Sequence, residues 1–512
     1  MGPMFDATPL LRLHARYRLA VLRQLVPPAV QERQLLSLIE KAKDTRFGRD
    51  HGFIHIRSVA GFQNQVPLRK YEDFWETYWQ ADFPRLSDVS WPGTIPYFAK
   101  TSGTTTGVTK FIPCSHQMIR SNIRAGIDLY VHHVANRPDS RVLGGESFQL
   151  GGSTDLRELE DGIFVGDISG ILANRMPWWT RGRYFPPESL TRIADWDEKI
   201  GAIAKAIVNR DIRTIGGAPS WLLVFFERLA AEWPAHQGRL ARFFPHLEML
   251  VHGGIHIAPY RPTLRRLLQG SHAETREVYP ASEGFIAVAD RGDGEGLRLM
   301  LDTGIFYEFV PVEELGAERP TRHWIGNVEK DVNYAIVVST CAGCWGYIIG
   351  DTIRFVDLDP PRLLITGRTS YSLSSFGEHL IGEEIERSVA QAAQEIGTGV
   401  NDFSVGTLFP EREGDVGRHL FIVEFANRVP SADAIEAFTR RLDELLSESN
   451  DDYRVHRHRD SAMKGPRVHP VEPGTFAAWM KRRGQVGGQH KVPRIINDPE
   501  LFGDLREFVG AA

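Results

Sequence analysis

Residues 101–110 have the sequence Thr-Ser-Gly-Thr-Thr-Thr-Gly-Val-Thr-Lys, and this stretch is the most informative of the chain. Five of its first six residues carry hydroxyl groups, and its two glycines leave the backbone uncovered. Backbone N–H groups in such a loop can approach phosphate oxygens closely, and the hydroxyls add further donors. Lys110 adds a positive charge at the end of the loop. The spacing of a Walker A loop is absent, so the stretch predicts a phosphate-binding loop of another kind, with a flexible polar linker as the alternative.

The surrounding sequence predicts an α/β fold. The loop follows a predicted strand at 95–99, so it is expected at the carboxyl end of that strand. Up to about residue 360, short β-branched runs alternate with longer helical patterns, which is typical of sheets flanked by helices. The predicted helices are 199–208, 221–231 and 260–268, and the predicted strands are 247–251, 334–340 and 352–356.

The pattern restarts as a smaller unit after Asp359-Pro360-Pro361. Strands at 363–366 and 419–425 and helices at 380–393 and 432–446 predict a small α+β domain. We therefore predict a large N-terminal domain at 1–366 and a smaller C-terminal domain at 367–512. One long domain with a terminal extension is the alternative.

Composition and charge narrow the class of protein. The 512 residues have a formal net charge of −5, which gives no basic excess for nucleic acid or an anionic membrane. Leu10, Leu13, Tyr17 and Val21 recur at helical spacing and predict an amphipathic helix packed on the body of the protein. Arginines interrupt this leucine-rich region, so neither a signal peptide nor a membrane span is expected.

Cysteines are few. Cys114, Cys341 and Cys344 are the 3 cysteines of the chain, so a disulfide framework is not expected and a reducing cytoplasm is the predicted compartment. Cys341-Ala-Gly-Cys344 has the CxxC spacing, but no second ligand pair for zinc follows it closely. We interpret this pair as a coincidence.

Three further elements contain residues suited to a nucleotide. Tyr279-Pro-Ala-Ser282-Glu283 offers an aromatic face, a hydroxyl for a phosphate and a carboxylate for Mg²⁺, which bridges phosphate oxygens. His252-Gly-Gly-Ile255 follows a predicted strand and exposes backbone. Tyr347-Ile-Ile-Gly-Asp351 ends in a carboxylate that can accept two hydrogen bonds from a ribose. For each element an ordinary turn is the alternative.

Together these elements resemble the adenylate-forming enzymes, which include firefly luciferase and the acyl-CoA synthetases. The plant auxin-inducible acyl-acid amido synthetases and their bacterial relatives are the most similar group. The resemblance rests on separated motifs in the family's order: residues 101–110, 279–283, 347–351 and 367–386, with the C-terminal run Gly484–Arg494.

The resemblance implies ATP and Mg²⁺ as cofactors and assigns roles to individual residues. Glu283 is the metal ligand, and Lys110, Glu283 and Lys491 are the catalytic residues that it implies. The implied nucleotide-binding residues are Thr101, Ser102, Gly103, Thr104, Thr105, Thr106, Gly253, Gly254, Tyr279, Ser282, Asp351 and Arg368.

Two positions depart from the family's pattern. Ile348 stands where the family usually has Arg, so the contact of that Arg is absent or supplied elsewhere. The plant enzymes have an active-site lysine after the Asp that binds ribose. Counted forward from Asp351, the position of that lysine falls at Glu378-His379 in this chain, so the lysine is missing. Lys491 on the glycine-rich C-terminal run is the first candidate for the catalytic cation, and Lys481 and His379 are the alternatives.

The resemblance implies a reaction in two steps. A carboxylic acid is activated as acyl-AMP with release of pyrophosphate, and the acyl group is then transferred to an amino acid or another amine. A monomer is expected. The acid pocket is expected between the 101–110 loop and the helices before it, with Trp221 and Phe225 on a further wall or, alternatively, in a buried helix. An acyl-CoA ligase and a catalytically silent nucleotide-binding protein are the alternative functions.

Overall fold

The computed structural model describes the chain apart from a set of short segments. The residues outside the description are 1–3, 102–109, 152–154, 177, 194–195, 254–260, 293, 370–371, 374–379, 410–416, 451–452, 455–456, 458–462, 486–491 and 512. The side chains of Thr101, Trp221 and Arg368 also lie outside it. Within the described part of the chain, no helix is long and apolar enough to cross a membrane.

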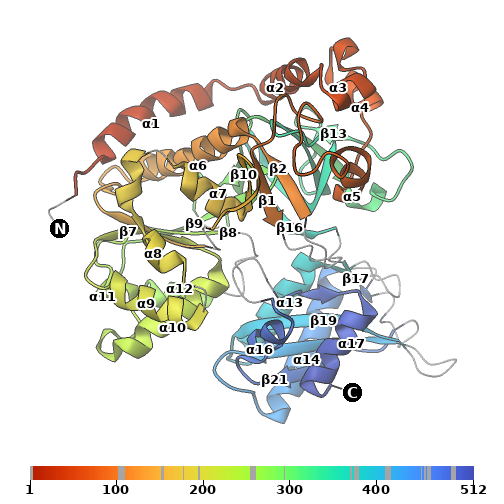
Figure 1. The fold of residues 1–512 in the computed structure, drawn as a ribbon. Helices are drawn as coiled ribbons and strands as arrows, with labels where there is room; N and C mark the ends of the chain where they lie inside the picture. Colours follow the sequence, from red (N-terminus) through yellow and green to blue (C-terminus); the bar gives the residue numbers. More distant parts are fainter. Residues whose placement is uncertain are drawn as a thin grey trace. The chain divides into compact units, whose positions relative to one another are not determined.

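The chain divides into two compact units (Figure 1). The larger unit comprises Met1–Ile255 and Arg265–Ile365, and the smaller comprises Thr366–Ala512 together with His256–Leu264. The long chain section of the smaller unit therefore begins at Thr366, beside the boundary that the sequence predicts. Each unit is described by itself below.

The larger unit is built on a sheet of 12 strands with a parallel section. Four neighbouring strands of that section run parallel: β3 (Glu146–Leu150), β7 (Ile212–Gly217), β8 (Met249–Gly253) and β9 (Glu274–Ala281). Helices α9 (Trp196–Ile207) and α10 (Pro219–Glu232) precede and follow β7. This alternation of strand and helix confirms the predicted α/β class.

The remaining strands of this sheet are mainly antiparallel. Strands β10 (Gly284–Val288) and β11 (Leu297–Leu299) continue from β9, and β16 (Pro361–Arg368), β15 (Tyr347–Leu358), β14 (Asn333–Thr340), β12 (Ile305–Pro311) and β13 (His323–Trp324) complete that side. Strand β12 is buried along its whole length, which explains its nearly continuous apolar sequence. Trp345, in the connection between β14 and β15, is fully buried among the aromatic rings of Phe47, Phe53 and Phe62.

Helix α6 (His116–Asn136) covers one face of the sheet, and α1 (Thr8–Arg23) lies alongside α6 (Figure 1). The face of α1 that packs inward contains Leu11, Ala15, Arg18 and Leu22. Arg18 binds Asp128 of α6 and Asp302 through its guanidinium, at 2.6 and 2.8 Å. A paired, hydrogen-bonded arginine can therefore occupy a buried position of this helix.

The predicted packing face of this helix is wrong. Leu10, Leu13 and Tyr17 are 63%, 67% and 70% exposed, so the stripe that they form faces solvent. Two apolar stripes lie on α1. The buried stripe contains the charged residue Arg18, so the sequence pattern did not indicate it as the packing face.

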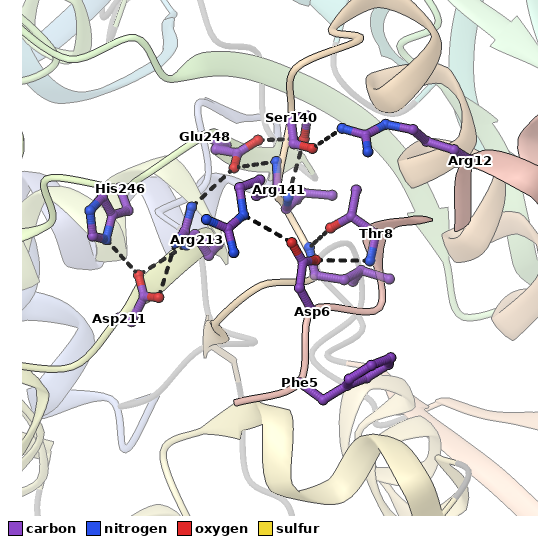
Figure 2. Close-up of polar contacts among 12 residues, drawn as sticks. Phe5, Asp6, Thr8, Arg12, Ser140, Arg141, Asp211, Arg213, His246 and Glu248 are labelled. Atoms are coloured by element: carbon purple, nitrogen blue, oxygen red, sulfur yellow. Dashed lines mark hydrogen bonds and ion pairs between the residues drawn. The ribbon is translucent and has the colours of Figure 1, made fainter. Parts of the chain in front are cut away.

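A polar cluster fixes the segment before α1 to the amino ends of the parallel strands (Figure 2). Glu248, directly before β8, accepts hydrogen bonds from the Ser140 hydroxyl and the Arg141 amide. The Arg141 guanidinium in turn binds Asp6 at 2.9 Å, and Asp6 accepts the amide N–H of Thr8 at 2.9 Å. The cluster thus joins residues that are far apart in the sequence.

Glu248 remains ionised in spite of its burial. Desolvation raises its pKa, but the His133 ring at 3.6 Å and hydrogen bonds from the Ser140 hydroxyl and the Arg141 amide outweigh this effect and lower the pKa below its usual value. Arg213 lies 3.4 Å from the same carboxylate. The carboxylate is therefore a buried charge with several donors.

The smaller unit contains a four-stranded sheet of order β21-β20-β19-β22. Its strands are β19 (Val400–Leu408), β20 (Arg418–Phe425), β21 (Arg467–Val471) and β22 (Ile495–Ile496). Helices α13 (Gly382–Glu395) and α14 (Ala432–Ser449) cover one face, and α16 (Thr475–Arg482) and α17 (Pro499–Val509) cover the other. This arrangement of helices on a small sheet agrees with the predicted α+β unit.

The three cysteines are buried and free. Burial raises the pKa of Cys114 and of Cys341 to about 12, and it raises that of Cys344 still further. Thiols in such surroundings are poor nucleophiles, because the thiolate is the reactive form.

Candidate nucleotide-binding site

The phosphate-loop candidate connects two paired strands. Strands β1 (Tyr97–Thr101) and β2 (Lys110–Cys114) are antiparallel, and Thr101 lies directly opposite Lys110. The two ends of the loop are therefore fixed at one point of a four-stranded sheet. Ser102, Gly103, Thr104, Thr105 and Thr106 lie outside the described residues, so their predicted roles stay predictions.

Lys110 is held by residues that precede the loop. Its Nζ atom lies 2.9 Å from Oε1 of Glu72 and 5.1 Å from the centre of the Tyr71 ring. The Tyr71 hydroxyl accepts the amide N–H of Phe111 at 3.0 Å. Burial raises the pKa of Glu72, but the hydrogen bond and charge of Lys110 outweigh it and lower the pKa. The lysine is thus oriented beside the loop by an ion pair.

The pair Gly253-Gly254 begins at the last residue of β8, where neighbouring backbone atoms leave little space. Gly253 is the last residue of β8 and lies opposite Val278 of β9. A Cβ atom at Gly253 would collide with the carbonyl oxygen of Val278, so only glycine fits there. Gly254 lies outside the described residues.

Ser282 and Glu283 occupy the tight turn between β9 and β10. Tyr279 lies on β9, four residues before Glu283, with its side chain 3% exposed. Glu283 is 9% exposed, which is low for a carboxylate on a turn. The turn therefore holds an acidic side chain that is largely shielded from solvent.

Asp351 lies on β15 rather than in a turn after it. The pairing of β15 with β14 shifts in register between Ala335 and Val337, where residues 349–351 lie opposite a single residue. Gly350 has φ of +94°, a conformation that favours glycine. Such a bulge redirects side chains, and here it redirects the segment that ends in Asp351.

The structure brings these two motifs together through Tyr279. The Tyr279 hydroxyl donates a hydrogen bond of 2.6 Å to Oδ2 of Asp351. The Tyr347 phenol is close enough to Glu283 for the charge of that carboxylate to raise its pKa. The first residue of the Tyr279 motif thus binds the last residue of the other motif. Tyr347 was not among the predicted site residues, although both motifs have a tyrosine four residues before a carboxylate.

The environment of this pair is poorly solvated. Burial raises the pKa of Tyr347 well above its usual value, and the charge of Glu283 raises it further. Burial likewise raises the pKa of Cys344, with a second contribution from Glu283. Glu283 is therefore close to two groups that stay neutral.

Within the chain as described, no cluster of three or more His, Cys, Asp or Glu side chains could hold a metal ion. Mg²⁺ in nucleotide sites is usually bound by one or two carboxylates, substrate phosphates and water, so it does not need such a cluster. A single protected carboxylate at Glu283 fits a metal that enters with a nucleotide.

The C-terminal run is anchored on both sides within the smaller unit. Before it, the Gln485 amide donates to the Met480 carbonyl at 3.0 Å. After it, Arg494 pairs with Asp402 at 3.0 Å, and the Ser404 hydroxyl donates to the Pro493 carbonyl at 2.7 Å. Lys491 itself lies outside the described residues.

The remaining charged candidates lie on other parts of the chain. Lys481 lies in the last turn of α16, and Arg368 ends β16, with its side chain outside the description. His379 also lies outside the described residues.

Phe225 of α10 is fully buried and packs on Phe148 of β3, with ring centres 4.8 Å apart. This packing is what a buried helix requires, and a pocket role for Trp221 or Phe225 stays a prediction.

Comparisons with known proteins identify the family of the chain. Three domains of one family match the chain: the GH3 family N-terminal domain at residues 25–273, the central domain at 298–368 and the C-terminal domain at 383–500.

Similar proteins are found among plant enzymes. A probable indole-3-acetic acid-amido synthetase, GH3.1 of Arabidopsis thaliana, is 22% identical over 91% of this chain and 89% of its own length. The indole-3-acetic acid-amido synthetase GH3.8 of Oryza sativa subsp. indica is 22% identical over 92% of this chain and 89% of its own.

Solved structures show the same fold. The GH3.15 acyl acid amido synthetase has a TM-score of 0.79 at 18% identity and covers 99% of this chain and 97% of its own. A 2-hydroxyisobutyryl-CoA ligase in the postadenylation state, in complex with 2-HIB-AMP, has a TM-score of 0.63 at 15% identity and covers 96% and 94%.

Proposed function

Because this chain belongs to the GH3 family, we propose that it is an ATP-dependent acyl-acid amido synthetase. It activates a carboxylic acid as acyl-AMP and transfers the acyl group to the amine of an amino acid. The observation that carries the proposal is the hydrogen bond of 2.6 Å from the Tyr279 hydroxyl to Asp351, because it joins two family motifs at one place.

The first half-reaction forms the mixed anhydride. A carboxylate oxygen of the acid attacks the α-phosphorus of ATP, and the bond to the β-phosphate oxygen breaks, which releases pyrophosphate. Such a reaction depends mainly on positioning and on stabilisation of charge. In the second half-reaction the amine nitrogen attacks the acyl carbon, AMP leaves, and the nitrogen loses a proton.

The site residues take the following roles in the proposal. The loop of Thr101 and residues 102–106 binds phosphate, with Lys110 beside it, while Gly253 and Gly254 line the adenine. Asp351 accepts the ribose hydroxyls, Ser282 binds a phosphate, and Tyr279 lies near the base. Glu283 would hold Mg²⁺, which would offset the charge of the phosphates.

The smaller unit supplies the remaining charges. Arg368 is assigned to ribose or phosphate, and Lys491 to the α-phosphate during adenylation.

The substrates are an acid, whose shape stays open, and an amino acid. We further propose that the protein works as a monomer in the cytoplasm, without nucleic acid or membrane. The three free thiols support a reducing compartment.

The experiment is ATP–pyrophosphate exchange across a panel of aromatic and aliphatic acids. Exchange with at least one acid is expected, and subsequent mass analysis with mixed amino acids should detect an amide. A thioester formed with CoA, and no amide, would favour the acyl-CoA ligase. ATP binding without exchange for any acid would favour a silent nucleotide-binding protein.

A further inference from the structure

Lys110, at the end of the phosphate-loop candidate, is paired with a carboxylate of its own chain. Its Nζ atom lies 2.9 Å from Oε1 of Glu72, and the centre of the Tyr71 ring lies 5.1 Å from the same atom. Lys110 is opposite Thr101, at the point where the loop leaves and rejoins the sheet. A phosphate that the loop binds through this ammonium group therefore has to share it with Glu72 or displace Glu72 from it.

Glu72 is held in place by the residues on either side of it. It belongs to α5 (Tyr71–Phe74), and Tyr71 is buried, with 6% exposure. Asp73, on the other side of Glu72, accepts a backbone N–H at the start of this helix, at 2.7 Å. The two adjacent acidic residues thus have different contacts: Asp73 closes the start of the helix, and Glu72 binds Lys110.

The ion pair is of a kind that a phosphate can displace. The side chains of Lys110 and Glu72 are 23% and 49% exposed, so water screens their attraction. Ion pairs in such surroundings change an equilibrium constant by at most about 5-fold. A phosphate group forms strong charge-assisted hydrogen bonds with an ammonium group, so it can take the place of the carboxylate. The affinity that is lost in this way should not exceed the same factor.

A carboxylate beside a phosphate-binding loop opposes the binding of phosphate, and the proposed reaction gives a reason for it. Pyrophosphate is a product of the first half-reaction, and the phosphate groups that it takes with it are those that the loop would hold in ATP. Tighter binding that is equal in the ground state and the transition state does not raise kcat. A carboxylate that weakens the hold on phosphate therefore does not slow the chemical step, and it helps pyrophosphate to leave.

We propose that Glu72 is a positioning residue that competes with phosphate for Lys110. It holds the ammonium group beside the loop, and it lowers the affinity of the loop for ATP and for pyrophosphate by the same factor. This inference rests on the proposed function and gives a part in it to a residue outside the predicted site.

The test is calorimetric titration of the full chain with ATP and, separately, with inorganic pyrophosphate, both in the presence of Mg²⁺. The variant Glu72→Gln keeps the size of the side chain and its acceptor oxygen and removes the charge. Because Glu72 is about half exposed, the fold should persist. We expect both ligands to bind about 5-fold more tightly, and KM for ATP in ATP–pyrophosphate exchange to fall by a similar factor. Loss of a merely structural contact would not raise affinity.

Two further variants serve as controls. Glu76→Gln removes a carboxylate charge at an exposed position four residues after Glu72, and it should bind both ligands as the wild type does. Lys110→Met removes the ammonium group and should weaken the binding of pyrophosphate about 10-fold, because a hydrogen bond between charged groups is lost.

Unchanged or weaker binding of both ligands in Glu72→Gln would overturn the proposal. An equal gain of affinity in Glu76→Gln would indicate a general effect of negative charge and would overturn it as well. Normal pyrophosphate binding in Lys110→Met would show that this lysine does not bind phosphate, with the same consequence. Should the wild type lack exchange with every acid, the proposed function fails. The pyrophosphate titration then still decides the role of Glu72, because it requires neither an acid nor turnover.

Discussion

Asp351 shows how much one residue depends on local backbone geometry. The bulge at 349–351 and the positive φ of Gly350 place this aspartate where the Tyr279 hydroxyl reaches it. For Asp351→Asn we expect kcat/KM for ATP in the exchange reaction to fall about 100-fold, because hydrogen bonds to a charged acceptor are lost.

The control for Asp351→Asn is Asp139→Asn, a change at an exposed aspartate before β3. It should behave as the wild type. Normal exchange in a folded Asp351→Asn protein would refute the ribose role.

Glu283 is the second test at this scale. The variant Glu283→Gln keeps the size of the side chain and removes its charge, so binding of a divalent cation should weaken. We expect exchange to fall at least about 100-fold at low Mg²⁺ and to recover partly at high Mg²⁺. Glu318→Gln, at an exposed position of the same unit, is the matched control. An unchanged Mg²⁺ dependence would show that the metal is bound elsewhere.

At the scale of elements, the C-terminal run is a segment fixed at both ends in one unit. We propose Lys491 of this run as the catalytic cation. For Lys491→Ala we expect kcat of adenylation to fall about 100-fold or more, which is typical when a charge that stabilises the transition state is removed. Lys481→Ala and His379→Ala, made in parallel, should have small effects. Wild-type activity in Lys491→Ala would move the role to whichever of the other two is impaired.

The cluster around Glu248 predicts a pH dependence of stability. The pKa of Glu248 is lowered in the folded state. Its contribution to stability is therefore complete above the unfolded pKa of about 4.3, and it is lost as the pH falls through the folded pKa. For Glu248→Gln we expect the free energy of unfolding of this unit to fall by about 3 kcal/mol at pH 7, because buried donors lose their charged partner.

The difference between wild type and Glu248→Gln should shrink when the pH is lowered below about 4. Thermal melts from pH 3 to 7 measure it, with Glu436→Gln on an exposed face of α14 as control. A difference that stays constant over this range would contradict the ionised state of Glu248.

Helices and strands with strong periodicity could be predicted from the sequence, and contacts between distant residues could not. The predicted helices at 199–208 and 432–446 agree with α9 and α14 to within a few residues. The predicted packing face of α1 was wrong, because the burial of the true face depends on the pairing of Arg18 with Asp128, which lies 110 residues away. The hydrogen bond from Tyr279 to Asp351 could not be predicted either, because it follows from a bulge and from the course of a sheet of 12 strands.

At the scale of the whole molecule, the two units raise the question of movement during the reaction. The native thiols are buried, and the pKa values of Cys114 and Cys341 are raised to about 12, so maleimide dyes should leave them unlabelled. Glu318→Cys and Glu436→Cys would then place one fluorophore pair on a single chain, with one dye in each unit. Energy transfer between the dyes should differ between the ATP-bound and acyl-AMP-bound protein if the smaller unit rotates between the half-reactions. A single, invariant transfer efficiency would exclude that rotation, so these inert thiols make the protein ready for single-molecule spectroscopy without removal of any native cysteine.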